Sequence, residues 1–182
     1  MPRMHQPHNE AQMAEAVARR LRRSTRELKV GDCVFDVVAY DKEEKLFRLV
    51  ECKLGSKATI VGHAFGQIAA YYAVLSARGR DFLDAFSKKI PFRYERLMAA
   101  TSENRRIRVA FYVALTDEAC KRVDLLRSVK RLLPAVGIIR VKNDGKCREY
   151  LREHGQKNHK LTEASPVVVK ILRGNSVNKK SE

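Results

Sequence analysis

Residues 33–54 read CVFDVVAYDKEEKLFRLVECKL, and this stretch decides the fold. Two runs within it, 33–40 and 46–54, are rich in β-branched and aromatic residues, which favour β-strands. The polar segment between them, 41–45, is typical of a turn. The sequence therefore predicts an antiparallel β-hairpin, around which the other elements are arranged.

Helices and further strands are expected on both sides of this hairpin, because apolar residues recur there at helical spacing or in short buried runs. The expected elements are, in order, a helix over 9–26, a short strand over 27–30, the hairpin, a helix over 59–77, short helices over 81–89 and 94–100, a strand over 107–115, a helix over 116–133 and a strand over 136–141. This order predicts an α/β fold with a mixed central β-sheet flanked by helices.

The division of the chain follows from the same pattern. Residues 1–150 are expected to form one domain, since single domains commonly reach this length. Residues 151–182 are expected to be a basic C-terminal extension that is partly disordered and has one β-like run over 167–172.

The charge of the chain points to a polyanionic partner. Among 182 residues there are 37 Lys and Arg against 21 Asp and Glu, a formal net charge of +16. Such an excess favours nucleic acid, although solubility alone also explains it. No run of 18 apolar residues occurs, and the first ten residues lack an apolar core. We therefore expect no membrane partner, no signal peptide and a cytoplasmic location, nucleoid-associated in a prokaryote.

The four cysteines do not form a recognisable site. Cys33, Cys52, Cys120 and Cys147 contain no C-x-x-C pair and no zinc-ligand spacing. Reduced thiols are the better interpretation.

Three charged residues lie in the apolar strands of the hairpin, and this needs an explanation. Asp36 interrupts the run 34–38, and Glu51 and Lys53 lie two residues apart, so that they face the same side of their strand. Burying charges is costly unless they are paired or bind metal. Two acids and a cation suit phosphodiester hydrolysis with a divalent metal, and a structural ion pair across the strands is the alternative.

Asp36, fourteen intervening residues and then Glu51-Cys52-Lys53 resemble the signature of the PD-(D/E)XK nuclease superfamily. Position 35 is Phe where the family often has Pro, which leaves the acid in place. The resemblance covers about residues 9–115. It implies a restriction endonuclease-like core in αβββαβ order, which agrees with the expected elements.

The family resemblance also implies roles for individual residues. Asp36 and Glu51 would bind Mg²⁺, or Mn²⁺, together with the backbone carbonyl of Cys52. Lys53 would orient the attacking water or stabilise the transition state. Glu10 matches an acid that many members carry on the first helix, and by its spacing it lies near the middle of that helix's apolar stripe.

Gln67 and Tyr71, one helical turn apart, resemble a helix motif of some exonuclease and resolvase branches, where it supports the site or contacts the DNA backbone. Simpler interpretations remain open: the Glu10 charge suits the positive start of its helix, and Gln67 and Tyr71 also fit a partly exposed polar stripe. His63, which continues that stripe, is more often structural in such a position, and Lys57 is as readily explained by solvation.

Two further patterns concern surfaces. The predicted first helix carries a basic cluster that suits DNA backbone contacts, or else an ordinary solvated face: Arg19, Arg20, Arg22, Arg23 and Arg26. Gly62, Gly66 and Ala70 form a ridge of small residues on the next helix, which predicts close packing against another element.

The sequence thus predicts a Mg²⁺-dependent deoxyribonuclease, an endonuclease of DNA repair, recombination or defence, that leaves a 5′-phosphate. DNA is a better substrate expectation than RNA, and a homodimer is compatible with the resemblance. The alternative is a non-catalytic nucleic-acid-binding protein that keeps the nuclease fold. An RNA-processing factor rests on charge alone. An iron–sulfur cluster is not expected, because only Cys147 lies near the C-terminal end.

Overall fold

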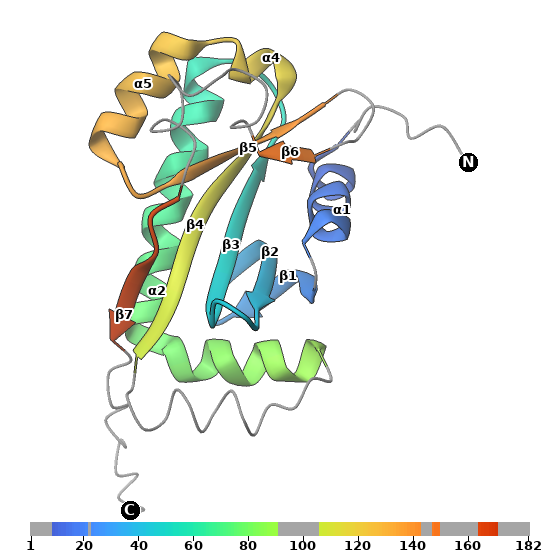
Figure 1. The fold of residues 1–182 in the computed structure, drawn as a ribbon, viewed down its shortest axis with the longest axis vertical. Helices are drawn as coiled ribbons and strands as arrows, with labels where there is room; N and C mark the ends of the chain where they lie inside the picture. Colours follow the sequence, from blue (N-terminus) through green and yellow to red (C-terminus); the bar gives the residue numbers. More distant parts are fainter. Residues whose placement is uncertain (1–8, 22, 91–105, 143–146, 150–163, 171–182) are drawn as a thin grey trace, which may run out of the picture.

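A computed structural model describes residues 9–21, 23–90, 106–142, 147–149 and 164–170 (Figure 1). The elements are α1 (Glu10–Arg20), β1 (Ser24–Val30), β2 (Cys33–Asp41), β3 (Leu46–Lys53), α2 (Ala58–Lys89), β4 (Arg106–Thr116), α4 (Asp117–Cys120), α5 (Val123–Leu132), β5 (Gly137–Val141), β6 (Cys147–Glu149) and β7 (Val167–Lys170). The predicted hairpin is therefore confirmed as β2 and β3, and the short strand before it as β1.

The strands form one mixed, open sheet in the order β1-β2-β3-β4-β5-β6. The pairs β1–β2, β2–β3 and β5–β6 are antiparallel, whereas β3–β4 and β4–β5 are parallel. A parallel connection needs a crossover, and α2 supplies it between β3 and β4. The expectation of an α/β chain with a mixed sheet flanked by helices is confirmed at this level.

Each face of the sheet has its own apolar core. On one face, Val61, Phe65 and Leu75 of α2, with Leu126 of α5, pack against strand residues such as Phe47. On the other face, the buried residues Met13, Ala14 and Val17 of α1 pack against Val50, Cys52 and Ile139. Figure 1 shows α1 and α2 lying apart, with the sheet between them.

Helix α2 is one long element with a kink. Its residues run from Ala58 to Lys89, but Arg78 has a non-helical backbone (φ −129°, ψ 32°). The two helices predicted over 59–77 and 81–89 are the two halves of this element, while the helix predicted over 94–100 lies outside the described residues. By length and composition alone α2 is apolar enough to cross a membrane, yet it supplies much of the core.

The first helix is shorter than predicted. It ends at Arg20, and Leu21 already has an extended backbone (φ −90°, ψ 116°). The Ser24 hydroxyl donates to the Ala18 carbonyl at 2.7 Å, which satisfies an otherwise unpaired acceptor at the helix end. Arg26 consequently lies in β1, so the predicted arginine cluster does not share one helix face.

The ridge of small residues on α2 does not pack against another described element. Gly62, Gly66 and Ala70 are exposed, and a Cβ added to either glycine would meet no described atom within 4 Å. The prediction of close packing is wrong for the part of the chain that the structure describes. The apolar stripe of α2 faces the sheet, so this ridge lies on the side turned away from the sheet.

Two differences concern the C-terminal half. The helix predicted over 116–133 is divided into α4 and α5, with a break at residues 121–122. The β-like run over 167–172 is β7, which pairs antiparallel with β4 and buries Val169. The sequence-based division at residue 150 leaves this strand in the extension, whereas in the structure it belongs to the same sheet.

Phe82 tests the packing of the second half of α2. Its side chain is fully buried, and its ring lies 5.5 Å from that of Phe35 and 5.2 Å from that of Phe47. We expect Phe82→Ala to lower the free energy of unfolding by about 3–5 kcal/mol, since it leaves a cavity. Tyr72 lies on the same helix and is 48% exposed, so Tyr72→Ala should lower the free energy of unfolding by about 1 kcal/mol or less. Urea denaturation measures both, and equal losses would contradict this packing.

Candidate active site

The predicted site residues meet where β2 and β3 separate. The ladder between these strands ends with the pair Val37↔Val50, so Asp36 and Glu51 lie one step beyond the last pair. There the Asp36 carboxylate, through Oδ2, accepts the backbone N–H of Cys52 at 2.8 Å. A side chain thus replaces a backbone partner, and the strand end stays anchored although the ladder has stopped.

The regular alternation of side chains between the two faces of β2 breaks at Asp36. In a regular strand, Phe35 and Val37 would face the same side. In the structure Phe35 and Val38 belong to the α2-side core, whereas Val37 belongs to the α1-side core. On the neighbouring strand β1, Glu27 stands opposite Asp36 in the register and has a positive φ of 51°. This irregularity in both strands places an acid where the ladder between β2 and β3 ends.

Tyr71 of α2 fills the gap between the separating strands. Its hydroxyl accepts the Asp36 N–H at 3.2 Å and lies 3.1 Å from the Val34 carbonyl oxygen. It also makes a short hydrogen bond with Glu51 Oε2. Because a hydroxyl has one hydrogen, it donates either to Val34 or to the Glu51 carboxylate at any moment. Burial and the charges of Asp36 and Glu51 raise the pKa of Tyr71, so the hydroxyl keeps its proton.

Glu51 is a fully buried carboxylate, with a side chain 0% exposed. Burial and the neighbouring Asp36 raise its pKa to about 7, against the opposing effects of Tyr71 and Lys53. The pKa of Asp36 is also raised, chiefly by burial, although the Cys52 N–H and Lys53 act in the opposite direction. Both raised pKa values favour the protonated acids, and a nearby cation acts in the opposite direction.

Lys53 is the cation that the structure places beside these acids. Its Nζ lies 3.0 Å from Glu51 Oε1 and 3.2 Å from Glu10 Oε2, and its side chain is 14% exposed. Burial would lower the pKa of Lys53, but the bonds and charges of Glu51 and Glu10 outweigh it and raise the pKa. The ammonium therefore remains charged.

Glu10 reaches the site from the first turn of α1, but not from the centre of an apolar stripe. Its side chain is 48% exposed, and the buried stripe of α1 begins at Met13. The Asn9 side chain caps this helix by accepting the Gln12 N–H at 2.9 Å. In this structure the Glu10 carboxylate pairs with Lys53, and its assignment as a metal ligand stays a prediction.

Other predicted residues lie at the margin of the site. Gln67 is one turn before Tyr71, and its Oε1 is buried without a hydrogen-bond partner. His63 is exposed one turn earlier, and Lys57 is the exposed N-cap residue of α2. The loop between β3 and α2 is tied down by Arg122, which donates to the Ser56 carbonyl at 2.7 Å.

Cys33 is a residue near the site that the sequence reasoning did not assign to it. Burial raises the pKa of its thiol, and the charges of Glu51 and Asp36 add to this effect. The only sequence signal was its position three residues before Asp36, which by itself does not distinguish it. Cys33, Cys52 and Cys120 are free thiols, as predicted; the side chain of Cys147 lies outside the described residues.

The donor set at this site fits a hard divalent cation. The Glu51 carboxylate is fully buried with Lys53 Nζ 3.0 Å from its Oε1, and Asp36 and Glu51 both carry raised pKa values that a bound cation would lower. Carboxylate and carbonyl oxygens are the ligands that Mg²⁺ prefers. Among the described residues no three His, Cys, Asp or Glu side chains converge as a ready metal cage. A cation would therefore rely on the two carboxylates, the Cys52 carbonyl and water.

Removing the Tyr71 hydroxyl tests its place in the gap. Tyr71→Phe leaves the Asp36 N–H, the Val34 carbonyl and Glu51 Oε2 without this partner. We expect the free energy of unfolding to fall by about 1–3 kcal/mol, the cost of buried polar groups left unpaired. Tyr72→Phe, next along the same helix but exposed, should be within about 0.5 kcal/mol of the wild type. Chemical denaturation compares the two, and a neutral Tyr71→Phe would contradict the bonding described.

Glu51→Gln tests whether the buried carboxylate destabilises the metal-free protein. Because the folded pKa is raised from 4.5 to about 7, the unfolded chain loses this proton first, and stability from this group falls as pH rises across that window. In EDTA at pH 8 we expect Glu51→Gln to stabilise the protein by about 1–3 kcal/mol. The exposed control Glu44→Gln should change little. A less stable Glu51→Gln protein at pH 8 would refute this reading of the burial.

The chain was compared with protein families, curated proteins and solved structures. No family model matches it, and neither the curated proteins nor the solved structures contain a significant match.

Proposed function

We propose that this protein is a divalent-metal-dependent nuclease with a restriction endonuclease-like core, acting on DNA. The observation that carries the proposal is the position of Glu51, fully buried beside Asp36 and Lys53 where β2 and β3 separate. A buried carboxylate destabilises a fold unless it is paired or binds a metal. Buried acids with raised pKa values are common at functional sites.

The proposed roles are those that the family resemblance implies, and the contacts of the residues support them. Asp36, Glu51 and the carbonyl of Cys52 would hold Mg²⁺ or Mn²⁺. When bound, such a cation lowers the pKa of a water and offsets charge on the phosphate oxygens. Lys53, kept charged by Glu51 and Glu10, would donate to a phosphate oxygen or to the attacking water.

In the proposed reaction, a water oxygen bonds to phosphorus and the P–O3′ bond breaks. The attacking water gives up a proton to solvent, and the departing 3′ oxygen takes up a proton, so the products are a 5′-phosphate and a 3′-hydroxyl. Tyr71 is a positioning residue in this scheme, because it contacts Asp36 and Glu51 and fixes the gap between their strands. Gln67, whose buried Oε1 has no hydrogen-bond partner, would accept from a water at the margin of the site.

The net charge of +16 supports a second candidate, a non-catalytic nucleic-acid-binding protein that keeps the same fold. This candidate accounts for DNA affinity through phosphate contacts. It gives no reason for two desolvated acids beside a lysine. Metal-dependent cleavage separates the two candidates.

The test is cleavage of labelled duplex, single-stranded, flap and four-way-junction DNA in Mg²⁺, Mn²⁺ or EDTA. We expect cutting only with metal, and a loss of at least about 100-fold in Asp36→Ala and Lys53→Ala, because each removes a group from the reacting centre. DNA binding by both variants should be largely intact.

Asp124→Ala and Lys88→Ala are matched controls, because they remove an acid and a base from exposed positions on α5 and α2. Both should cut at close to the wild-type rate. Wild-type activity in Asp36→Ala or Lys53→Ala would end the nuclease proposal, and binding without cutting on every substrate would favour the second candidate.

A further inference from the structure

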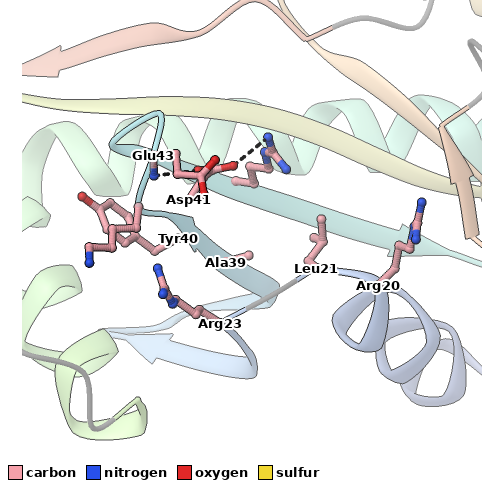
Figure 2. Close-up of a pocket in the computed structure, with 9 residues that line it drawn as sticks. Arg20, Leu21, Arg23, Ala39, Tyr40, Asp41 and Glu43 are labelled. Carbon is pink, nitrogen blue, oxygen red and sulfur yellow. Dashed lines mark hydrogen bonds and ion pairs between the residues drawn. The ribbon is translucent and has the colours of Figure 1, made fainter.

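A polar hollow of about 610 Å³ lies between the end of α1 and the β2–β3 hairpin (Figure 2). Figure 2 shows Arg20 and Arg23 on either side of Leu21, with Tyr40 and Asp41 contributed by the hairpin. The backbone N–H of Tyr40 donates to the Arg23 carbonyl at 3.2 Å, which ties the connection after α1 to β2. The two walls of the hollow are therefore held together by main-chain bonding.

The hollow is lined by more positive than negative charge. Its cations are Arg20, Arg23, Lys42 and Arg48, and its acids are Asp41 and Glu43, a difference of four against two. Such a concave, cationic surface attracts a phosphate group more strongly than a flat one does, since the surrounding protein excludes water from part of it.

One of the two acids is already neutralised. Asp41 Oδ2 lies 3.1 Å from an Arg48 nitrogen, and Oδ1 accepts the N–H groups of Glu43 and Glu44. The guanidinium of Arg48 is held in place by this ion pair, and Glu44 Oε2 lies 3.9 Å from the same guanidinium, while Arg48 Nε is buried without a hydrogen-bond partner. Asp41 and Arg48 therefore neutralise each other, and the remaining lining charges are Arg20, Arg23 and Lys42 against Glu43, which still favours an anion.

The floor of the hollow is partly apolar. Leu21, Ala39 and the ring of Tyr40 line it, and the Tyr40 ring lies 4.8 Å from that of Phe47, which is buried in the core. A fixed aromatic ring beside cations suits a nucleotide unit, whose base stacks and whose phosphate is paired. The volume is within the range of small-ligand sites.

We propose that this hollow binds a backbone phosphate of a nucleic-acid strand, at a site separate from the candidate active site. Arg20 and Lys42, both exposed, make the first contacts, and Arg48 completes the cationic wall. The proposal shares with the proposed function only the choice of nucleic acid as partner, and it requires no cleavage.

The distance between the two sites indicates how long a strand must be to reach both. Arg48 and Glu51 lie three residues apart on β3, roughly 10 Å at about 3.3 Å per residue. This spacing is a lower limit, because side chains three residues apart leave opposite faces of a strand. A nucleic-acid strand that touches both sites therefore spans more than about three nucleotides at about 3.4 Å per step.

The experiment measures binding of a fluorescent 20-nucleotide DNA, single-stranded and duplex, to the full chain in EDTA over a series of salt concentrations. We expect Arg20→Gln/Lys42→Gln to weaken binding about tenfold or more and to reduce the slope of log K against log salt by about 1–2. The single variants should each give part of this loss. Arg48→Gln is avoided, because breaking the ion pair with Asp41 would disturb the hairpin.

The matched control is Arg80→Gln/Lys88→Gln, which removes two exposed cations from the second half of α2. A loss of affinity no greater than in this control would overturn the proposal. Calorimetry with inorganic phosphate and deoxyadenosine monophosphate tests whether the hollow binds a free phosphate or a mononucleotide and not a nucleic-acid strand. Millimolar binding that depends on Arg20 and Lys42, with DNA affinity unchanged, would also overturn it and make the hollow a free-phosphate site.

Metal-dependent cleavage is measured separately, so the two proposals fail in different ways. Loss of DNA affinity in Arg20→Gln/Lys42→Gln without any cleavage by the wild type supports the hollow and removes the nuclease. Cleavage by the wild type with affinity unchanged in this variant does the reverse.

Discussion

The hydroxyl of Tyr71 holds the point at which β2 and β3 separate, and the candidate site depends on this separation. Without it, the Asp36 N–H and the Val34 carbonyl would have to find partners in a continued ladder. A continued ladder would pair Asp36 and Glu51 as ordinary cross-strand neighbours in an apolar sheet. The tyrosine hydroxyl instead contacts three polar partners, and both carboxylates lie side by side where the ladder between β2 and β3 ends.

At Glu51, the burial that would suit the proposed metal site also lowers the stability of the fold. The pKa of Glu51 near 7 means that its ionised form is disfavoured by burial, and Lys53 alone does not reverse this. The same desolvation would strengthen the hold of the two acids on a divalent cation, because charges interact more strongly away from water. The aromatic core of Phe35, Phe47 and Phe82 lies on the same face and provides burial that offsets this cost.

Local patterns predicted much of the fold and the centre of the site. The hairpin, the short strand before it and both halves of α2 follow from alternation and helical spacing, which depend on near neighbours. Asp36, Glu51, Lys53, Tyr71 and Glu10 are brought together as the order of elements indicated. Their chemical roles rest on family resemblance and remain predictions.

What the sequence did not predict depends on contacts between distant segments. The first helix was predicted to be too long, because its periodicity does not reveal the hydrogen bond from the Ser24 hydroxyl to the Ala18 carbonyl. The exposed side of Gly62 and Gly66 is decided by which stripe of α2 meets the sheet. Cys33 lies close enough to Glu51 and Asp36 for their charges to raise the pKa of its thiol, and this proximity depends on how β2 and β3 are placed.

The β2–β3 hairpin connects the two proposed sites mechanically. Five consecutive residue pairs form the ladder between these strands. Val37↔Val50 borders the candidate active site, Ala39↔Arg48 lies in the middle, and Asp41↔Leu46 ends the ladder beside the hollow. A paired ladder is stiff compared with a loop, so the separation of the carboxylates from the cationic hollow is fixed in advance. If both proposals hold, a short ligand would occupy one of the two sites, whereas a longer nucleic-acid strand would reach both without further ordering of this hairpin. The same hairpin would thus place the scissile phosphate and favour a polymer over a mononucleotide.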